Sequence, residues 1–173
     1  MRGMTMRVAI MTVSDGVAAG EREDRGGPAC EEALRASGIA HEIVSRQILA
    51  DDRQQIARAI RLTAYSRHAD LIVLTGGTGV APRDRTPEAV REVVEFEVPG
   101  LAEKMRSDTG ADFPAAYLSR QVVGVRDQTL VVALPGSPKG AADCLRTILD
   151  LLPHSIALLR GEKAAHPPGE DLD

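Results

Sequence analysis

The sequence has few of the residues that hold small or secreted folds together. Its 173 residues include two cysteines, no tryptophan, two tyrosines and two phenylalanines. Two cysteines cannot supply a disulfide framework or a cysteine-based zinc site, so we expect Cys30 and Cys144 to be small buried apolar residues within helices. With so few aromatic rings, the core must be built from aliphatic and alanine side chains.

The sequence also lacks a long apolar run and an excess of basic residues. No apolar stretch approaches the roughly 18 to 20 residues that cross a bilayer. Residues 1–6 have no long apolar segment behind a basic one, as a signal peptide would. The formal net charge of −4 does not provide the basic field of a broad nucleic-acid surface. We therefore expect a cytoplasmic protein that binds neither nucleic acid nor membrane.

The apolar residues that are present follow an alternating pattern of strands and helices. They make up 43% of the chain, enough for one core. Short apolar runs predict strands at 6–13, 41–48 and 71–74 and a hairpin or bent strand within 121–134. Helices are predicted at about 28–37, after residues 51–52, from about 86, from 99 to about 110, and from 138 to about 152. This alternation predicts a three-layer α/β fold, with a mostly parallel sheet and helices on both faces.

Four loops follow predicted strands and carry polar or glycine residues. They begin at Ser14, Asp51, Thr75 and Pro135. In open α/β sheets, ligands bind beyond the carboxyl ends of the strands. We therefore expect these loops to meet at one edge of the sheet, although they lie far apart in the chain.

The loop from Thr75 to Gly79 contains three glycines directly after a strand. Glycine lets the backbone approach a ligand and direct N–H groups at an anion. Thr86 resembles an N-cap, and a helix N-terminus there would favour a phosphate. The spacing fits neither a P-loop nor the dinucleotide-binding pattern. A simple tight turn needs only one or two glycines, so a phosphate-binding loop is the better interpretation.

From Gly76 to Ala89 the sequence reads Gly-Gly-Thr-Gly, a short spacer, then Arg-Asp-Arg-Thr-Pro-Glu-Ala. This stretch resembles the molybdopterin-binding family of molybdenum cofactor biosynthesis, in its compact, single-domain branch with a Rossmann-like fold. Further matches are Ser14-Asp15, Asp24 with Gly26, Pro99-Gly100, Met105-Arg106, Ser119-Arg120-Gln121 and Leu134-Pro135-Gly136-Ser137-Pro138-Lys139. The resemblance covers about residues 6–161, which we take as one molybdopterin-binding domain between flexible termini at 1–5 and 162–173.

The resemblance implies a nucleotidyltransferase that adenylylates molybdopterin. The terminal phosphate of molybdopterin would attack the α-phosphorus of Mg-ATP, giving adenylylated molybdopterin and pyrophosphate. Asp51 and Asp84 match the family's catalytic carboxylates and are assigned to Mg²⁺, with ATP as co-substrate. Spacing alone would let Asp51 be only a helix cap. The family often has proline before this aspartate, whereas this chain has Ala50.

The same resemblance implies a larger set of residues that bind the substrates. The set comprises Ser14, Asp24, Gly26, Thr75, Gly76, Gly77, Thr78, Gly79, Ser119, Arg120, Pro135, Gly136, Ser137 and Lys139. A solvated surface charge is an equal alternative for Arg120 and for Lys139. Arg83 either contacts phosphate or pairs with a neighbouring acid.

Two other functions are weighed against adenylyl transfer. One is a relative that binds molybdopterin without efficient catalysis; retention of both Asp51 and Asp84 favours the enzyme. The other is a dinucleotide-binding oxidoreductase, but residues 14–20 lack its glycine pattern. By analogy with the family's compact members we expect a homotrimer, which serves a partner enzyme that inserts molybdenum.

Overall fold

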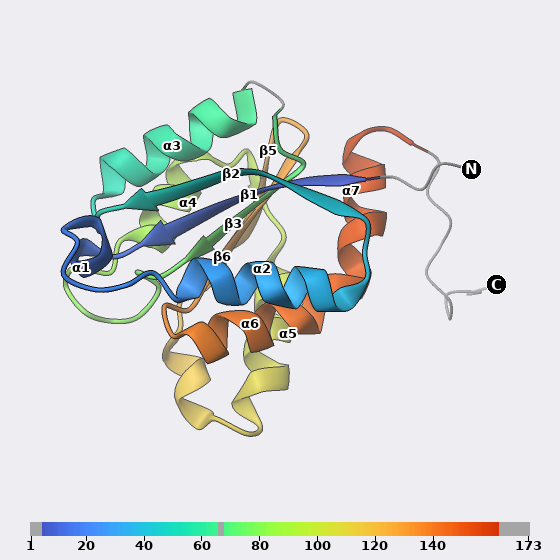
Figure 1. Ribbon diagram of the computed structural model, residues 1–173. Helices are drawn as coiled ribbons and strands as arrows, with labels where there is room; N and C mark the ends of the chain where they lie inside the picture. The colour runs from blue at the N-terminus through green and yellow to red at the C-terminus, as the bar shows by residue number, and fades with distance from the viewer. Residues whose placement is uncertain (1–4, 66–67, 163–173) are drawn as a thin grey trace.

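The computed structural model describes residues 5–65 and 68–162. Its centre is a six-stranded sheet with the order β2-β1-β3-β6-β5-β4 (Figure 1). Strands β1, β2, β3 and β6 are parallel, whereas β5 runs antiparallel to both β6 and β4. The strands are β1 (Met6–Val13), β2 (His41–Leu49), β3 (Leu71–Thr75), β4 (Phe96–Glu97), β5 (Val123–Arg126) and β6 (Thr129–Leu134). The predicted mostly parallel sheet is confirmed, and β1 has the predicted bounds.

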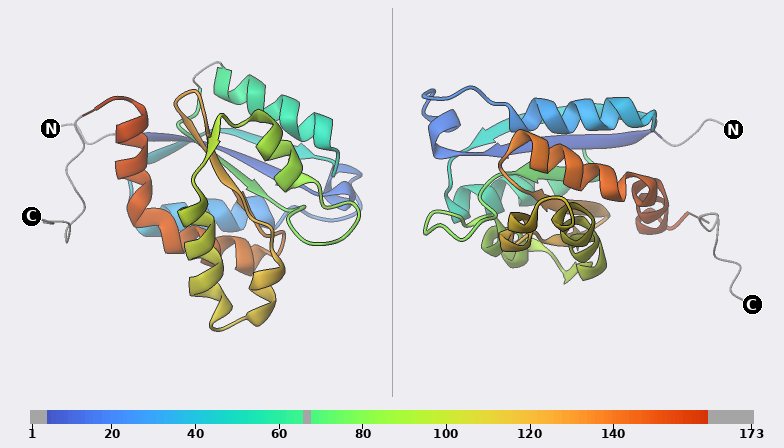
Figure 2. Two further views of the ribbon diagram at one scale, coloured as in Figure 1. Left: turned by 180° about the vertical axis from the view of Figure 1, so that it is seen from behind. Right: turned by 90° about the horizontal axis from the view of Figure 1, so that it is seen from below.

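Helices cover both faces of the sheet. They are α1 (Asp15–Ala18), α2 (Gly26–Ser37), α3 (Arg53–Tyr65), α4 (Thr86–Val93), α5 (Pro99–Gly110), α6 (Pro138–Ile148) and α7 (Leu152–Leu159), with 3₁₀ turns η1 (Pro114–Leu118) and η2 (Leu149–Leu151). Helices α3 and α4 pack side by side on one face, and α2, α5, α6 and α7 on the other (Figures 1 and 2). The three-layer α/β prediction is therefore confirmed.

The two hydrophobic cores follow from the alternation of side chains along the central strands. In β1, Val8 and Ile10 face α2, whereas Ala9 and Met11 face α3. Every residue of β3 is buried, as expected for a parallel strand covered on both faces. Both cysteines are buried within helices as predicted. Burial raises the pKa of the Cys30 thiol to about 12, so it is an unreactive packing residue.

Some predicted helix bounds differ from the structure. The last predicted helix, from 138 to about 152, is wrong as one element: α6 ends at Ile148, and η2 separates it from α7. Pro153 in the first turn of α7 lacks the N–H that would continue the earlier helix. Helix α2 begins at Gly26, two residues before the predicted start. The short elements α1, β4 and η1 were not predicted, because segments of two to five residues show no hydrophobic period.

Residues typical of turns predicted the structure more accurately than the helix bounds did. Gly38 ends α2 in the left-handed conformation with φ 72°, as expected of a glycine at the carboxyl end of a helix. The hairpin predicted within 121–134 is the β5–β6 pair, with Asp127 at φ 53° in its turn.

A buried charge cluster lies at the amino ends of the parallel strands, just before β3. Asp70 is only 3% exposed and accepts hydrogen bonds from the backbone N–H of Arg7, at 2.8 Å, and from Nε of the same residue, at 3.1 Å. Arg160, at the end of α7, pairs with Asp70 from the other side at 2.7 Å. The cluster fixes α7 against the amino ends of β1 and β3.

The predicted flexible termini, 1–5 and 162–173, lie outside the described residues apart from Thr5 and Glu162. Within residues 5–65 and 68–162, none of the helices has the length and apolar character needed to cross a membrane.

Candidate active site

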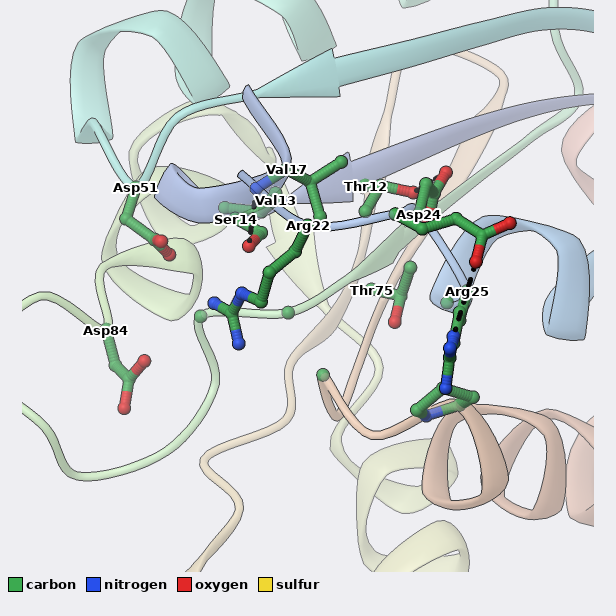
Figure 3. A pocket seen from close by; sticks show the side chains of 16 residues that line it. Thr12, Val13, Ser14, Val17, Arg22, Asp24, Arg25, Asp51, Thr75 and Asp84 are labelled. Carbon is green, nitrogen blue, oxygen red and sulfur yellow. Dashed lines mark hydrogen bonds and ion pairs between the residues drawn. The ribbon is translucent and has the colours of Figure 1, made fainter. Parts of the chain in front are cut away.

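A cavity of about 620 Å³ opens at the carboxyl ends of the parallel strands (Figure 3). Its walls include residues from the four loops that follow β1, β2, β3 and β6: Ser14, Asp51, Gly76, Gly77 and Gly136. The loop before α2 completes the wall. The expectation that these four loops meet at one edge of the sheet is confirmed.

The glycine loop has a backbone that only glycine adopts easily. Gly76 and Gly77 have φ angles of 111° and 65°. A Cβ atom on Gly76 would lie 2.1 Å from the carbonyl oxygen of Val13. The loop therefore packs directly against the end of β1, and side chains at these positions are excluded by both conformation and space.

Hydrogen bonds fix this loop to its neighbours. The Gly76 N–H donates to the Leu134 carbonyl at 3.1 Å, so this group is not free for an anion. The carbonyls of Gly76 and Gly77 accept from the hydroxyl and the N–H of Thr86, at 2.8 and 3.1 Å. The N–H of Gly77, which lines the cavity, has no hydrogen-bond partner within the described residues. It is the loop's best-placed donor for a phosphate.

Thr86 is not the helix cap predicted from the sequence. Arg85 occupies the N-cap position of α4, and Thr86 is the first helical residue. Its buried hydroxyl donates to Gly76 instead. Thr86 thus shapes the glycine loop, and the N-cap prediction is wrong because a tertiary contact takes the hydroxyl.

Two serines cap helices at the ligand-binding edge of the sheet. Oγ of Ser14 accepts from the Val17 N–H at 3.3 Å, and Oγ of Ser137 accepts from the Gly140 N–H at 3.2 Å. Each hydroxyl therefore keeps its own proton for donation to a ligand. The Thr75 hydroxyl, in contrast, donates to the Pro135 carbonyl at 2.8 Å and joins two loops.

Asp24 anchors the start of α2. Its carboxylate accepts from the Gly27 N–H at 3.0 Å and from the Thr12 hydroxyl at 2.9 Å. A Cβ atom on Gly26 would lie 2.9 Å from Oγ1 of Thr75, so this glycine permits close packing of the loop. Thr12 was not among the predicted site residues, because a threonine inside a strand carries no motif signal.

Asp51 and Asp84 both line the cavity. Asp51 accepts a hydrogen bond from the Asp15 N–H at 2.9 Å, and Asp84 accepts one from the Ala81 N–H at 2.9 Å. The alternative of Asp51 as a helix cap is not what the structure shows. The neighbouring Asp52 accepts from the Gln55 N–H at 2.8 Å in the first turn of α3.

Electrostatics favour a cation between these carboxylates. Burial raises the pKa of Asp51, and the negative charges of Asp15 and Asp84 add to this effect. The Asp15 N–H and the guanidinium of Arg83 act in the opposite direction. A bound cation would relieve both the desolvation and the repulsion.

The residues that line the cavity fit a magnesium ion for which a bound ligand would supply many of the coordinating oxygens. Within the described residues, no group of three or more histidine, cysteine, aspartate or glutamate side chains is arranged to hold a metal. Mg²⁺ is commonly held by one or two carboxylates, with phosphate oxygens and waters completing the shell. Asp51 and Asp84, which both line the cavity, are the carboxylates that could take this part.

Arg83 and Arg120 each pair with an acid. Both nitrogens of the Arg83 fork bond to the Asp15 carboxylate at 2.8–2.9 Å. Arg120 pairs with Glu88 and also donates to the carbonyls of Gly79 and Asp84, at 2.7 and 2.9 Å. Arg120 therefore braces the segment from the glycine loop to Asp84.

Several predicted residues lie beside a second cavity of about 740 Å³. It is lined by Ser119, Pro135, Ser137 and Lys139, together with residues of α5, η1 and α6. Lys139 is exposed and pairs with Asp143 at 2.5 Å. Thr78 and Gly79 line neither cavity. The predicted Arg120 also lines neither cavity. The segment from Pro135 to Pro138 contributes to both cavities, so the other predicted residues divide between two adjoining spaces.

Sequence reasoning did not find Arg22, which projects into the first cavity (Figure 3), or Glu23 and Arg25, which also line it. These residues lie in a polar loop without a motif, so their placement depends on the path of the folded chain.

Most of the chain matches one protein family. The model of the family described as "probable molybdopterin binding domain" matches residues 9–154, and the chain belongs to this family. The chain is 35% identical over 157 residues to the molybdopterin adenylyltransferase of Helicobacter pylori, which covers 91% of this chain and 89% of that protein.

Two further proteins are similar to this chain over about nine tenths of its length. The molybdopterin adenylyltransferase of Escherichia coli is 32% identical over 169 residues, covering 91% of this chain and 87% of that protein. The solved structure of the molybdopterin biosynthesis enzyme MoaB from Thermus thermophilus has a TM-score of 0.86 and 46% identity, covering 93% of this chain and 100% of that one.

Proposed function

We propose that this protein catalyses the Mg-ATP-dependent adenylylation of molybdopterin. The observation that carries the proposal is the meeting of Asp51 and Asp84 with the glycine loop in one cavity. The adenylyltransferases to which the chain is similar across about nine tenths of its length support it. A relative that only binds molybdopterin would have no need of two carboxylates beside a phosphate loop.

The reaction joins two polyanions. An oxygen of the terminal phosphate of molybdopterin attacks the α-phosphorus of ATP; the bond from that phosphorus to the β-phosphate oxygen breaks, and pyrophosphate leaves. Bound magnesium would neutralise phosphate charge and favour departure of pyrophosphate. The N–H of Gly77 and the hydroxyl of Ser14 would hold phosphate oxygens, and Asp51 and Asp84 would hold the metal. Alignment of the two phosphates supplies much of the rate.

We assign the remaining part of molybdopterin to the second cavity. Ser119, Ser137 and Lys139 line it, and the segment from Pro135 to Pro138 reaches both cavities. A substrate with a phosphate at one end and a ring system at the other can therefore lie across this segment. The more apolar part of the second cavity, near Phe113 and Ala116, suits a ring.

The direct test is incubation of the purified protein with molybdopterin, ATP and magnesium. We expect equal amounts of pyrophosphate and adenylylated molybdopterin, and no product when magnesium is removed by a chelator. Tight binding of molybdopterin without any pyrophosphate release would instead identify a non-catalytic binding protein in the same pathway.

The proposal extends to assembly and pathway. We propose a cytoplasmic homotrimer that passes its product to an enzyme that inserts molybdenum. Light scattering at micromolar concentration should give a mass three times that of the 18.4 kDa chain. A monomer at all concentrations would contradict the assembly but leave the reaction open to its own test.

A further inference from the structure

Arg22 lies in the loop between α1 and α2, and its side chain is part of the wall of the first cavity. Figure 3 shows its guanidinium group extending toward the space between Ser14 and Asp84. The same cavity is lined by Gly77, whose N–H has no hydrogen-bond partner among the described residues. A positive side chain thus projects into the cavity from a position two residues before Asp24, at a residue that is not among the family matches given above.

Gly16 makes this position of Arg22 possible. A Cβ atom on Gly16 would lie 2.6 Å from Nε of Arg22 and 3.0 Å from one of its terminal nitrogens. The N–H of Arg22 also donates to the Gly16 carbonyl at 3.1 Å. Gly16 is buried beneath this contact, so the guanidinium lies across the first turn of α1 where any other residue would push it away.

Arg22 differs from its neighbouring arginines in its ion pairing. Arg83 pairs with Asp15, Arg25 with Glu23 at 3.6 Å, and Arg120 with Glu88. The guanidinium of Arg22 has no hydrogen-bond or ion-pair partner among residues 5–65 and 68–162. Its five N–H donors remain for a ligand.

A planar guanidinium matches the geometry of phosphate oxygens and binds them through paired hydrogen bonds. Asp51 and Asp84 make the cavity negative, so a ligand with several phosphates needs additional positive charge besides a metal. Arg22 can supply this charge without separating an existing ion pair, whereas Arg83 and Arg120 cannot.

We propose that Arg22 is a polyphosphate-binding residue of this cavity, held in place by the absence of a side chain at Gly16. In the reaction proposed above, on which this inference rests, it binds the departing pyrophosphate and stabilises the negative charge that develops there.

The test uses inorganic pyrophosphate as the probe, titrated with magnesium present and followed by calorimetry. Arg22→Ala should weaken binding by about tenfold or more, since a charge-assisted hydrogen bond is lost. Arg22→Lys should restore part of the affinity. Arg58→Ala is the matched control, because Arg58 is an exposed arginine on α3, away from the cavity. It should bind pyrophosphate as the wild type does.

Gly16→Ala provides a second and independent variant. The atom it would displace is the end of a flexible side chain, so the fold should tolerate the methyl group while the guanidinium moves. Gly16→Ala should weaken pyrophosphate binding when Arg22 is present and have no further effect in the Arg22→Ala background. Circular dichroism and thermal unfolding verify that each variant is folded.

The outcomes separate this inference from the proposed reaction. If wild type and Arg22→Ala bind pyrophosphate equally, or if neither binds it, the inference is wrong, whatever the adenylylation assay gives. If binding depends on Arg22 but the wild type makes no adenylylated molybdopterin, the polyphosphate site is upheld and the proposed reaction is wrong. Additive losses in Gly16→Ala and Arg22→Ala would contradict the role given to Gly16.

Discussion

Asp15 and Asp51 are joined by two reciprocal hydrogen bonds. The N–H of Asp15 donates to the Asp51 carboxylate at 2.9 Å, and the N–H of Asp51 donates to the Asp15 carboxylate at 3.0 Å. Arg83 bonds to the same Asp15 carboxylate. Asp15 therefore connects the loops after β1 and β2 to the segment that carries Asp84, and it sets the spacing of the two carboxylates proposed to hold magnesium.

The Asp15 carboxylate is not proposed to contact the substrates, but its removal should still impair the reaction. We expect Asp15→Ala to lower kcat by about tenfold, because misplaced catalytic groups are costly, and to raise the magnesium concentration needed for half-maximal rate. Asp15→Asn keeps an acceptor for the Asp51 N–H and should recover part of the rate. The losses in Asp15→Ala and Arg83→Ala should not add in the double variant; full additivity would show that the two residues act separately.

Asp51→Asn and Asp84→Asn test the carboxylates themselves. Each keeps the size and a hydrogen-bond acceptor but loses the charge that we propose holds the cation. Pyrophosphate release should fall on the order of 10²-fold or more, while molybdopterin binding, measured directly, persists. Asp52→Asn is the matched control, since asparagine caps a helix as well as aspartate does. Normal turnover and unchanged magnesium dependence in both site variants would make these residues structural.

Asp51 should reduce the stability of the protein when no ligand is bound. Burial raises the pKa of Asp51, so the folded chain holds this proton more tightly than the unfolded chain does. Its contribution to stability is therefore fully present below the unfolded pKa, near 3.8, and is lost as the pH rises through the higher folded value. At neutral pH, Asp51→Asn should be more stable than the wild type in urea unfolding, and the difference should shrink in acid.

Magnesium provides the control for this stability measurement. Magnesium bound through the Asp51 charge, as proposed, should stabilise the folded wild type more than Asp51→Asn. An Asp51→Asn protein that is no more stable at neutral pH would show that the negative charge of Asp51 is already well compensated without a metal.

Asp70 has the opposite pH dependence. Burial alone would raise its pKa, but hydrogen bonds from Arg7 and Arg160 outweigh burial and lower it. Its contribution is present above the unfolded pKa of 3.8 and is lost as the pH falls through the lower folded value. Asp70→Asn should cost about 3 kcal/mol in the free energy of unfolding at neutral pH, because two arginines lose their buried partner.

The measurement for Asp70 is urea unfolding across the acid range, together with the rate per folded molecule. The difference between the wild type and Asp70→Asn should shrink in acid, and the rate should be unchanged because the residue lies at the opposite end of the sheet. A difference in stability that does not vary with pH would assign the effect to packing instead of charge.

Much of the fold followed from local patterns, whereas parts of the site did not. The run from Met6 to Val13 specified a strand by its composition, and the common edge of parallel strands brought Asp51 near Asp84. The hydroxyl of Thr86 went to Gly76 because the folded loop offered an acceptor, which no cap preference describes. The position of the Arg22 side chain depends on the open space above Gly16, which is a tertiary contact and not a motif, so spacing in the sequence could not identify it.

Strand β3 separates the two charged regions of the molecule. Asp70 precedes its first residue, and the glycine loop follows its last, Thr75. The strand is buried throughout and paired on both sides, by β1 and β6. An engineer who wants a more heat-resistant enzyme can therefore redesign the surroundings of Arg7 and Arg160 as a separate module, and leave the chemistry at the far end of the strand untouched.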